Sequence, residues 1–252
     1  MEVDLLEPVT YAYAFIELFA GILMVISGLF VLKKDPKFDL NILVSTSVFG
    51  LAILFFMSGL LYLFQLTDSL IINFMRDLAE IGAIISATAI LFAGIFTYYG
   101  PTWKSLKFLV PISILILFSI VFMSLEHVYI QVINGTNFYY FKSDLVYAFL
   151  FITGTPLVFL LLGILLFEIV RRKAKEDNTR KKLFFMEAGM FLFLLSASFM
   201  VVVLQIAIPN GVKPDLFLVI FGQLGYLLAS VFVFQAFRGS KQRDVGQDKT
   251  PS

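Results

Sequence analysis

The residues of this chain that could do chemistry are a few charged and amide side chains inside long apolar segments. A charged group in hydrocarbon costs about 2.5 to 3.5 kcal/mol on insertion scales, so each of these side chains needs a physical reason to be there. Glu17 is the clearest example, because it lies roughly one helical turn inside the edge of its apolar segment. We therefore expect Glu17 to face protein rather than lipid.

A second polar group lies near the start of the apolar segment 70–99. Arg76 and Glu80 are four residues apart and share one helix face, while Asp77 precedes Glu80 by three residues. Small residues recur at four-residue spacing on more than one face of the same segment, which predicts a central helix that several neighbours approach closely. A central position would let the other segments direct polar side chains toward this group, namely Glu17, Gln65, Glu126, His127, Gln205 and Gln223.

This polar cluster has two interpretations. A buried pair of Arg76 and Glu80 with Glu17 nearby would lock three helices together, and such structural contacts are common in membrane bundles. The cluster carries more acid than pairing requires, which instead favours a ligand, ion or proton site. The candidate ligand-binding residues are Glu17, Arg76, Asp77, Glu80 and Gln223.

The residue inventory argues against several other chemistries. The chain has no Cys, which removes disulfides, thiolate metal sites and thiol catalysis. Its single His, His127, cannot form a bis-histidine haem site or a metal centre built on several histidines. The last apolar segment has no Lys for a retinal Schiff base. No catalytic motif is present, so we expect no enzyme activity, no cofactor and no metal.

The elements that must position these side chains are long apolar helices. The 252 residues are 60% hydrophobic and 15% charged, outside the range of soluble domains, and the mean hydropathy is +0.93. Runs of about 20 apolar residues alternate with short polar stretches, as in membrane-spanning helices. We predict an all-α polytopic membrane protein, a seven-transmembrane helix bundle over residues 1–238, followed by a short disordered cytoplasmic tail, 239–252. The predicted spans are 9–32, 40–65, 70–99, 107–125, 144–170, 183–208 and 216–238.

The basic residues predict the orientation of the bundle. Sixteen of the 19 Lys and Arg residues fall in connections that lie on one side once the seven spans are folded back and forth. Cytoplasmic segments retain Lys and Arg, so we expect a multi-pass cell-membrane protein with its N-terminus outside and its C-terminus in the cytoplasm. The sequon beginning at Asn134 then lies outside, where glycosylation is possible, although such triplets are frequent by chance.

The cytoplasmic half holds few polar residues inside the spans. Glu168 and Glu187 lie close to the basic segment 171–182, and we expect them to pair with it. That segment has two interpretations, a docking surface for a cytoplasmic signalling protein or a topology determinant beside anionic lipid.

The region from residue 40 to residue 100 resembles a known family in its pattern. An apolar helix ends in Gly59-Leu-Leu-Tyr62, a short turn Thr67-Asp68-Ser69 follows, and a long helix carries Arg76 and Glu80 before closing at Tyr98-Tyr99-Gly100. This resembles the seven-helix N-terminal membrane sensor region of prokaryotic histidine kinases. The resemblance covers residues 9–238 in topology. It implies a receptor-like module that passes a helix displacement through the last span to a cytoplasmic output.

Only fifteen residues follow Phe237, so we expect no kinase domain and an output supplied by a separate partner. The favoured interpretation is a non-catalytic sensor or receptor-like module that binds a small molecule or ion from the outer side. One alternative is a small transporter or ion or proton pathway using Glu17, Asp77 and Glu80. Another is a structural accessory subunit of a membrane complex. A sensor predicts an outer pocket above a dry inner half, whereas a transporter needs a polar route to both sides.

Overall fold

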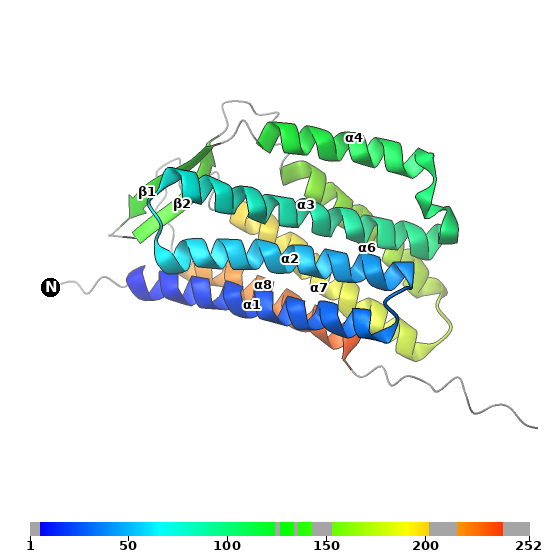
Figure 1. The fold of residues 1–252 in the computed structure, drawn as a ribbon. Coiled ribbons are helices and arrows are strands. Elements are labelled where there is room, and N and C mark those ends of the chain that lie inside the picture. Colours follow the sequence, from blue (N-terminus) through cyan, green and yellow to red (C-terminus); the bar gives the residue numbers. More distant parts are fainter. Residues whose placement is uncertain (1–5, 124–126, 134–135, 143–152, 202–215, 239–252) are drawn as a thin grey trace, which may run out of the picture.

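The computed structural model describes residues 6–123, 127–133, 136–142, 153–201 and 216–238 (Figure 1). These residues form seven α-helices, one 3₁₀ turn and a two-stranded sheet. The helices are α1 (Leu6–Lys34), α2 (Asp39–Phe64), α3 (Ser69–Tyr99), α4 (Leu106–Met123), α6 (Thr155–Lys173), α7 (Asp177–Val201) and α8 (Leu216–Phe237). The 3₁₀ turn η1 (Gly100–Lys104) follows α3, and the strands are β1 (His127–Ile133) and β2 (Thr136–Lys142).

The expectation of a helical protein with membrane-spanning segments is confirmed in its coarse form. Within the described residues, five helices are long and apolar enough to cross a membrane: Tyr11–Lys34, Asp39–Phe64, Ser69–Tyr99, Leu106–Met123 and Asp177–Met200. The described part of α8 adds a shorter apolar helix, Phe221–Phe237. Helix α6 ends in three basic residues, Arg171, Arg172 and Lys173.

Short connections make consecutive helices antiparallel. Gln65 ends α2 in the left-handed conformation, with φ 46°. Asp68 then begins α3, because its carboxylate accepts hydrogen bonds from the backbone N–H groups of Leu70 and Ile71 at 2.9 and 3.1 Å. This N-cap satisfies amide groups that have no partner inside the helix. The turn therefore fixes where the segment carrying Arg76 and Glu80 begins.

Six of the helices form a closed ring. Contacts run from α1 to α2, α3, α6, α7, α8 and back to α1. Helix α4 contacts α3, α6 and η1 and lies outside the ring (Figure 1). It buries only Ile112, Ser119 and Met123. Helix α3 has many neighbours, as expected from its small residues, but it is one wall of the ring rather than a central axis.

Small residues bring α2 and α3 unusually close. A Cβ atom built on Gly50 would lie 2.6 Å from the carbonyl oxygen of Gly82. Ser47 and Ser86 share a hydrogen bond of 3.1 Å across the same interface. Because lipid tails are as apolar as leucine, such backbone proximity and interhelical hydrogen bonding are what hold membrane helices together. The α2 and α3 walls of the ring are therefore fixed relative to each other.

Opposite ends of the ring differ in charge. At one end, Lys104 of η1 pairs with Asp39 of α2 at 3.0 Å, and the Lys34 ammonium lies 5.6 Å from the ring centroid of Phe237 in α8. The last turn of α6 contacts α7 there too, through the ion pair of Arg171 and Glu187. We call this the basic end, and the opposite end, which carries the strands, the hairpin end (Figure 1).

Some expected boundaries are wrong. The connection between the fourth and fifth spans, expected as a loop, contains the antiparallel hairpin of β1 and β2, in which Tyr129 faces Tyr140 and Ile133 faces Thr136. The basic segment 171–182 is mostly helical, because α6 continues to Lys173 and α7 begins at Asp177. The sequon residue Asn134, the first part of the expected fifth span, 144–152, and the tail 239–252 lie outside the described residues.

A substitution at the α2–α3 contact tests this packing. We expect Gly50→Ala to destabilise the protein by about 1 to 3 kcal/mol, because the added methyl meets backbone atoms that cannot move aside. Thermal unfolding of the purified protein in detergent measures the effect. Gly154→Ala is the matched control, since nothing lies within 4 Å of its added Cβ. Equal unfolding temperatures for the two variants would contradict the close approach.

Candidate functional site

A cavity lies inside the ring, in the half nearer the hairpin. Its volume is about 240 Å³. All six ring helices and both strands contribute lining residues. Most of the wall is apolar, and its charged side chains are Glu17, Arg76 and Glu80. A mostly apolar cavity with a few convergent polar groups is the usual form of a small-molecule site.

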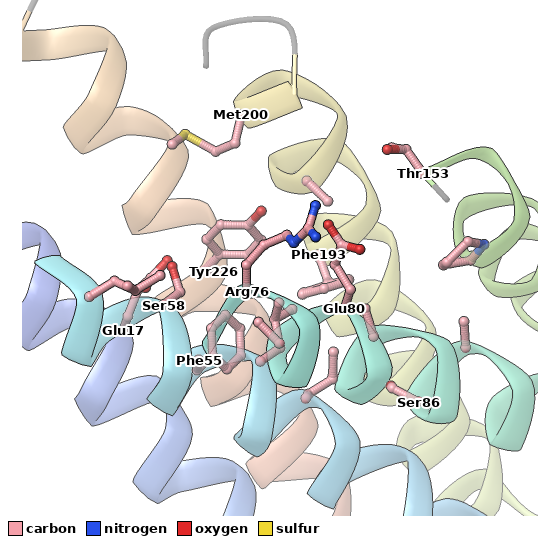
Figure 2. Close-up of a pocket in the computed structure, with 18 of the residues that line it drawn as sticks. Glu17, Phe55, Ser58, Arg76, Glu80, Ser86, Thr153, Phe193, Met200 and Tyr226 are labelled. Atoms are coloured by element: carbon pink, nitrogen blue, oxygen red, sulfur yellow. The ribbon is translucent and has the colours of Figure 1, made fainter. Parts of the chain in front are cut away.

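Glu17 is buried in this cavity, as the sequence predicts. Its exposed fraction is 3%. The polar groups of Tyr13, Ser58 and Gln223 surround its carboxyl group, and Figure 2 shows Ser58 directed toward it from α2. Within the described residues, the Oε2 atom of Glu17 has no partner in hydrogen-bonding geometry. Glu17 therefore keeps one buried oxygen available inside a cavity.

Arg76 has contacts that the sequence did not predict. Its guanidinium is 4% exposed and pairs with Asp77 at 2.6 Å, and it also donates a hydrogen bond of 3.3 Å to the backbone oxygen of Met123. The Asp77 side chain is 39% exposed and does not line the cavity. The i,i+4 spacing placed Arg76 and Glu80 on one face correctly. The adjacent carboxylate of Asp77 nevertheless bends back to reach the guanidinium.

Glu80 joins the cavity from α3 at the level of Arg76. Figure 2 shows the heads of Arg76 and Glu80 directed into the same part of the cavity, with Glu17 and Ser58 on another side of it. The structure thus brings Glu17, Arg76 and Glu80 to one cavity and leaves Asp77 at its edge. Glu126 and Gln205, also expected in the cluster, lie outside the described residues.

Gln223 adds a polar group beside Glu17. It is fully buried in α8. Neither its amide nitrogen nor its amide oxygen has a hydrogen-bond partner in the described part of the chain. Gln223 does not itself line the cavity, but its amide lies beside the Glu17 carboxyl group. Burying an amide without hydrogen-bond partners costs free energy in a folded protein. The Gln223 amide therefore has a donor and an acceptor that a bound ligand could use.

Aromatic side chains form part of the cavity wall, which the sequence did not predict. The rings of Tyr13 and Tyr62 lie 4.1 Å apart, and Tyr226 lies 5.4 Å from both Phe55 and Phe193. The strand residue Tyr139 donates hydrogen bonds to the carbonyl oxygens of Leu61 and Leu66 at 3.2 and 2.9 Å, which attaches the hairpin to the end of α2. Aromatic residues are so frequent in this sequence that no local signal distinguishes these from lipid-facing ones.

Below the cavity the ring is filled by apolar side chains. Met24, Val48, Ile90 and Val233 each have an exposed fraction of 1% or less. The buried serines at this level are satisfied locally, since Ser27 and Ser230 donate to the carbonyl oxygens of Leu23 and Tyr226. We call this packing the apolar layer. Its thickness along α2, from Leu51 in the cavity to Val44 at the basic end, is about 10 Å.

The acids of the basic half are paired, as expected. Arg171 bonds Glu187 of the neighbouring helix at 2.8 Å and also contacts Glu168. Arg172 holds the other oxygen of Glu168 at 2.6 Å. These contacts join α6 to α7. These two acids have arginine partners. Glu17 differs from them, because no cation among the described residues is in ion-pairing contact with it.

This contrast predicts opposite effects of the same substitution at two sites. We expect Glu17→Gln to raise the free energy of unfolding by about 1 kcal/mol, because it removes a buried acid that lacks an ionic partner. Glu187→Gln is the comparison, and we expect it to lower stability by about 1 to 3 kcal/mol through loss of the Arg171 pair. Both are measured by thermal unfolding in the same detergent. A loss of stability in Glu17→Gln as large as that in Glu187→Gln would instead support the structural interpretation of Glu17.

Comparison with known proteins gives no relative from which a role can be transferred. No model of a known protein family matches the chain, and neither curated proteins nor solved structures give a match. The resemblance to the sensor region of prokaryotic histidine kinases is therefore untested and stays a prediction. The chain's role has to be argued from the cavity and from the two ends of the ring.

Proposed function

We propose that the protein is a non-catalytic, receptor-like membrane module with seven spans, whose outer half binds a small molecule or ion. The observation that carries the proposal is the convergence of Glu17, Arg76 and Glu80 on one largely apolar cavity of about 240 Å³. Charged groups in the membrane are normally retained for binding, transport or proton transfer. The buried oxygen of Glu17 and the amide of Gln223 supply hydrogen-bonding capacity for a bound ligand.

The charge asymmetry of the ring supports the orientation. Basic residues from α1, η1, α6 and α7 gather at one end, and membrane proteins keep such residues in the cytoplasm. The hairpin end, with the cavity below it, then faces outward. In this orientation α1 begins outside and α8 ends inside, and a ligand reaches Glu17 from the outer side.

The apolar layer favours binding over transport. Met24, Val48, Ile90 and Val233 fill the ring between Glu17 and the basic end. An ion crossing this layer would lose its hydration without gaining protein ligands. Transport remains the second candidate, because another cavity of about 150 Å³ lies at the basic end of the same ring. A transporter would open the layer during each cycle.

Helix α8 offers a route from the ligand pocket to the cytoplasmic face. Tyr226 lines the outer cavity, and Ala236 and Phe237 lie at the basic end of the same helix. A ligand that displaces the Tyr226 ring would shift a rigid helix whose other end reaches the basic surface. A separate signalling protein that contacts the segment 171–182 would detect that shift. This output rests on the resemblance to kinase sensor regions and on the exposed charges of Arg172, Lys173 and Lys175.

Because the chain has no native Cys, single-cysteine labelling tests the cavity directly. Ser58 lines the cavity beside Glu17. In sealed vesicles, we expect Ser58→Cys to react with a small, charged, membrane-impermeant methanethiosulfonate reagent added outside and not with the same reagent added inside. Reaction from both sides would support the transporter. Absence of reaction from either side, with an exposed control labelled, would contradict an outward-opening pocket.

Two exposed positions test the orientation and provide those controls. Thr67 lies in the turn between α2 and α3 at the hairpin end, and Asn178 lies at the start of α7 at the basic end. We expect Thr67→Cys to be labelled by impermeant reagent only from outside the cell and Asn178→Cys only from the cytoplasmic side. The reverse pattern would show that the bundle has the opposite orientation in the membrane. Labelling of both positions from one side would contradict the up-and-down arrangement.

A further inference from the structure

The second cavity, at the basic end, has chemistry of its own. All six ring helices contribute lining residues, so it lies on the axis of the ring. The apolar layer separates it from the outer cavity. Its charged lining residues are two lysines, Lys34 from α1 and Lys182 from α7. Their position gives the ring a cationic site opposite the acidic one.

The two lysines share this cavity without an acidic side chain that pairs with either of them in the described structure. Both are partly buried and line the same cavity, so their positive charges repel each other across it. No carboxylate among the described residues forms an ion pair with either of them. The nearby acids are already engaged, because Asp39 pairs with Lys104 at 3.0 Å and Glu187 pairs with Arg171 at 2.8 Å.

The other polar side chains of the cavity already donate hydrogen bonds to backbone oxygens. The two lysine ammonium groups are therefore its charged hydrogen-bond donors. The Asn41 amide donates to the backbone oxygen of Asp35 at 3.0 Å. The Thr97 hydroxyl donates to the backbone oxygen of Ala93 at 2.6 Å. The apolar floor, which includes Phe167 and Met186, lowers the local dielectric constant and so strengthens both the repulsion between the ammonium groups and their attraction for an anion.

We propose that this cavity binds a phosphate-type oxyanion between Lys34 and Lys182. The oxygens of a tetrahedral phosphate group accept hydrogen bonds from both ammonium groups. Free phosphate as a dianion neutralises both charges, and the phosphodiester of a lipid headgroup neutralises one of them. The phosphate group belongs either to a free anion or to the headgroup of an anionic lipid, since basic pockets between membrane helices bind both kinds of group through the same contacts. The binding chemistry does not depend on the outer pocket. Only its assignment to the cytoplasmic side rests on the proposed orientation.

Thermal unfolding of the full chain in neutral detergent tests the site. Inorganic phosphate is titrated against sodium chloride of equal ionic strength, which corrects for screening of the lysine repulsion. We expect phosphate to raise the unfolding temperature by about 2 to 5 °C and the effect to saturate, as for a ligand that binds only the folded state. A parallel titration with phosphatidylglycerol in mixed micelles, against phosphatidylcholine, distinguishes the two sources of the phosphate group.

Matched variants locate the effect. The double substitution Lys34→Gln and Lys182→Gln should abolish the stabilisation by phosphate or phosphatidylglycerol. The control pair Lys33→Gln and Lys181→Gln removes the same charge from exposed neighbours and should retain it. Lys182→Glu provides an internal partner for Lys34, so it should raise the unfolding temperature without phosphate and remove the response to phosphate.

Two results would overturn the proposal. One is the absence of a saturable shift with either phosphate or phosphatidylglycerol. The other is an equal loss of the shift in the control pair, which would indicate binding to the general basic surface. Cysteine labelling at Ser58 tests the outer pocket separately, so either site can fail without the other.

Discussion

The cost of a charged group in hydrocarbon is the constraint on which this structure depends. A helix that carries Glu17 or Arg76 through a membrane has to turn that side chain away from lipid. The closed ring provides a protected interior shared by α1 and α3, and both side chains lie within it at 3% and 4% exposure. Close approach of α2 and α3 at Gly50 and Gly82 fixes two walls of that interior. Burial of charge and tight packing therefore act together to form the cavity.

The two halves of the ring use their acids differently. In the basic half, Glu168 and Glu187 are held by arginines, and these pairs join α6 to α7. In the half nearer the hairpin, Glu17 faces hydroxyl and amide groups and has no described cation in ion-pairing contact. The Oε1 atom of Glu187 also lacks a hydrogen-bond partner in the described residues, so the two acids differ in the ionic partner, which only Glu187 has. A buried acid without a described cation in ion-pairing contact is the physical basis for proposing a ligand in the cavity beside Glu17.

Much of the helical framework follows from the sequence, because the length of an apolar run sets the length of a spanning helix. The run 40–65 differs from α2 by one residue at each end, and the run 70–99 differs from α3 by one residue at its start. Helical spacing also placed Arg76 and Glu80 on one face. The pair of Arg76 and Asp77 joins consecutive residues of α3, and the three- and four-residue spacing of helical contacts does not predict such a pair. The aromatic wall around Tyr226 could not be predicted, because it depends on which helices become neighbours. Helices that are apolar all round carry no periodic signal for that choice, and the aromatic, weakly alternating strands of the hairpin resemble ordinary connections.

We infer that a dry apolar layer closes the polar cavity of the hairpin half from the basic end. An experimental structure in a lipid nanodisc, at a resolution that reveals ordered water, tests it most directly. The account predicts water or ligand density beside Glu17, Arg76 and Glu80, and none between Val48, Ile90 and Val233. A continuous chain of water molecules from Glu17 through that layer to Lys34 would contradict it and would make the protein a conduit.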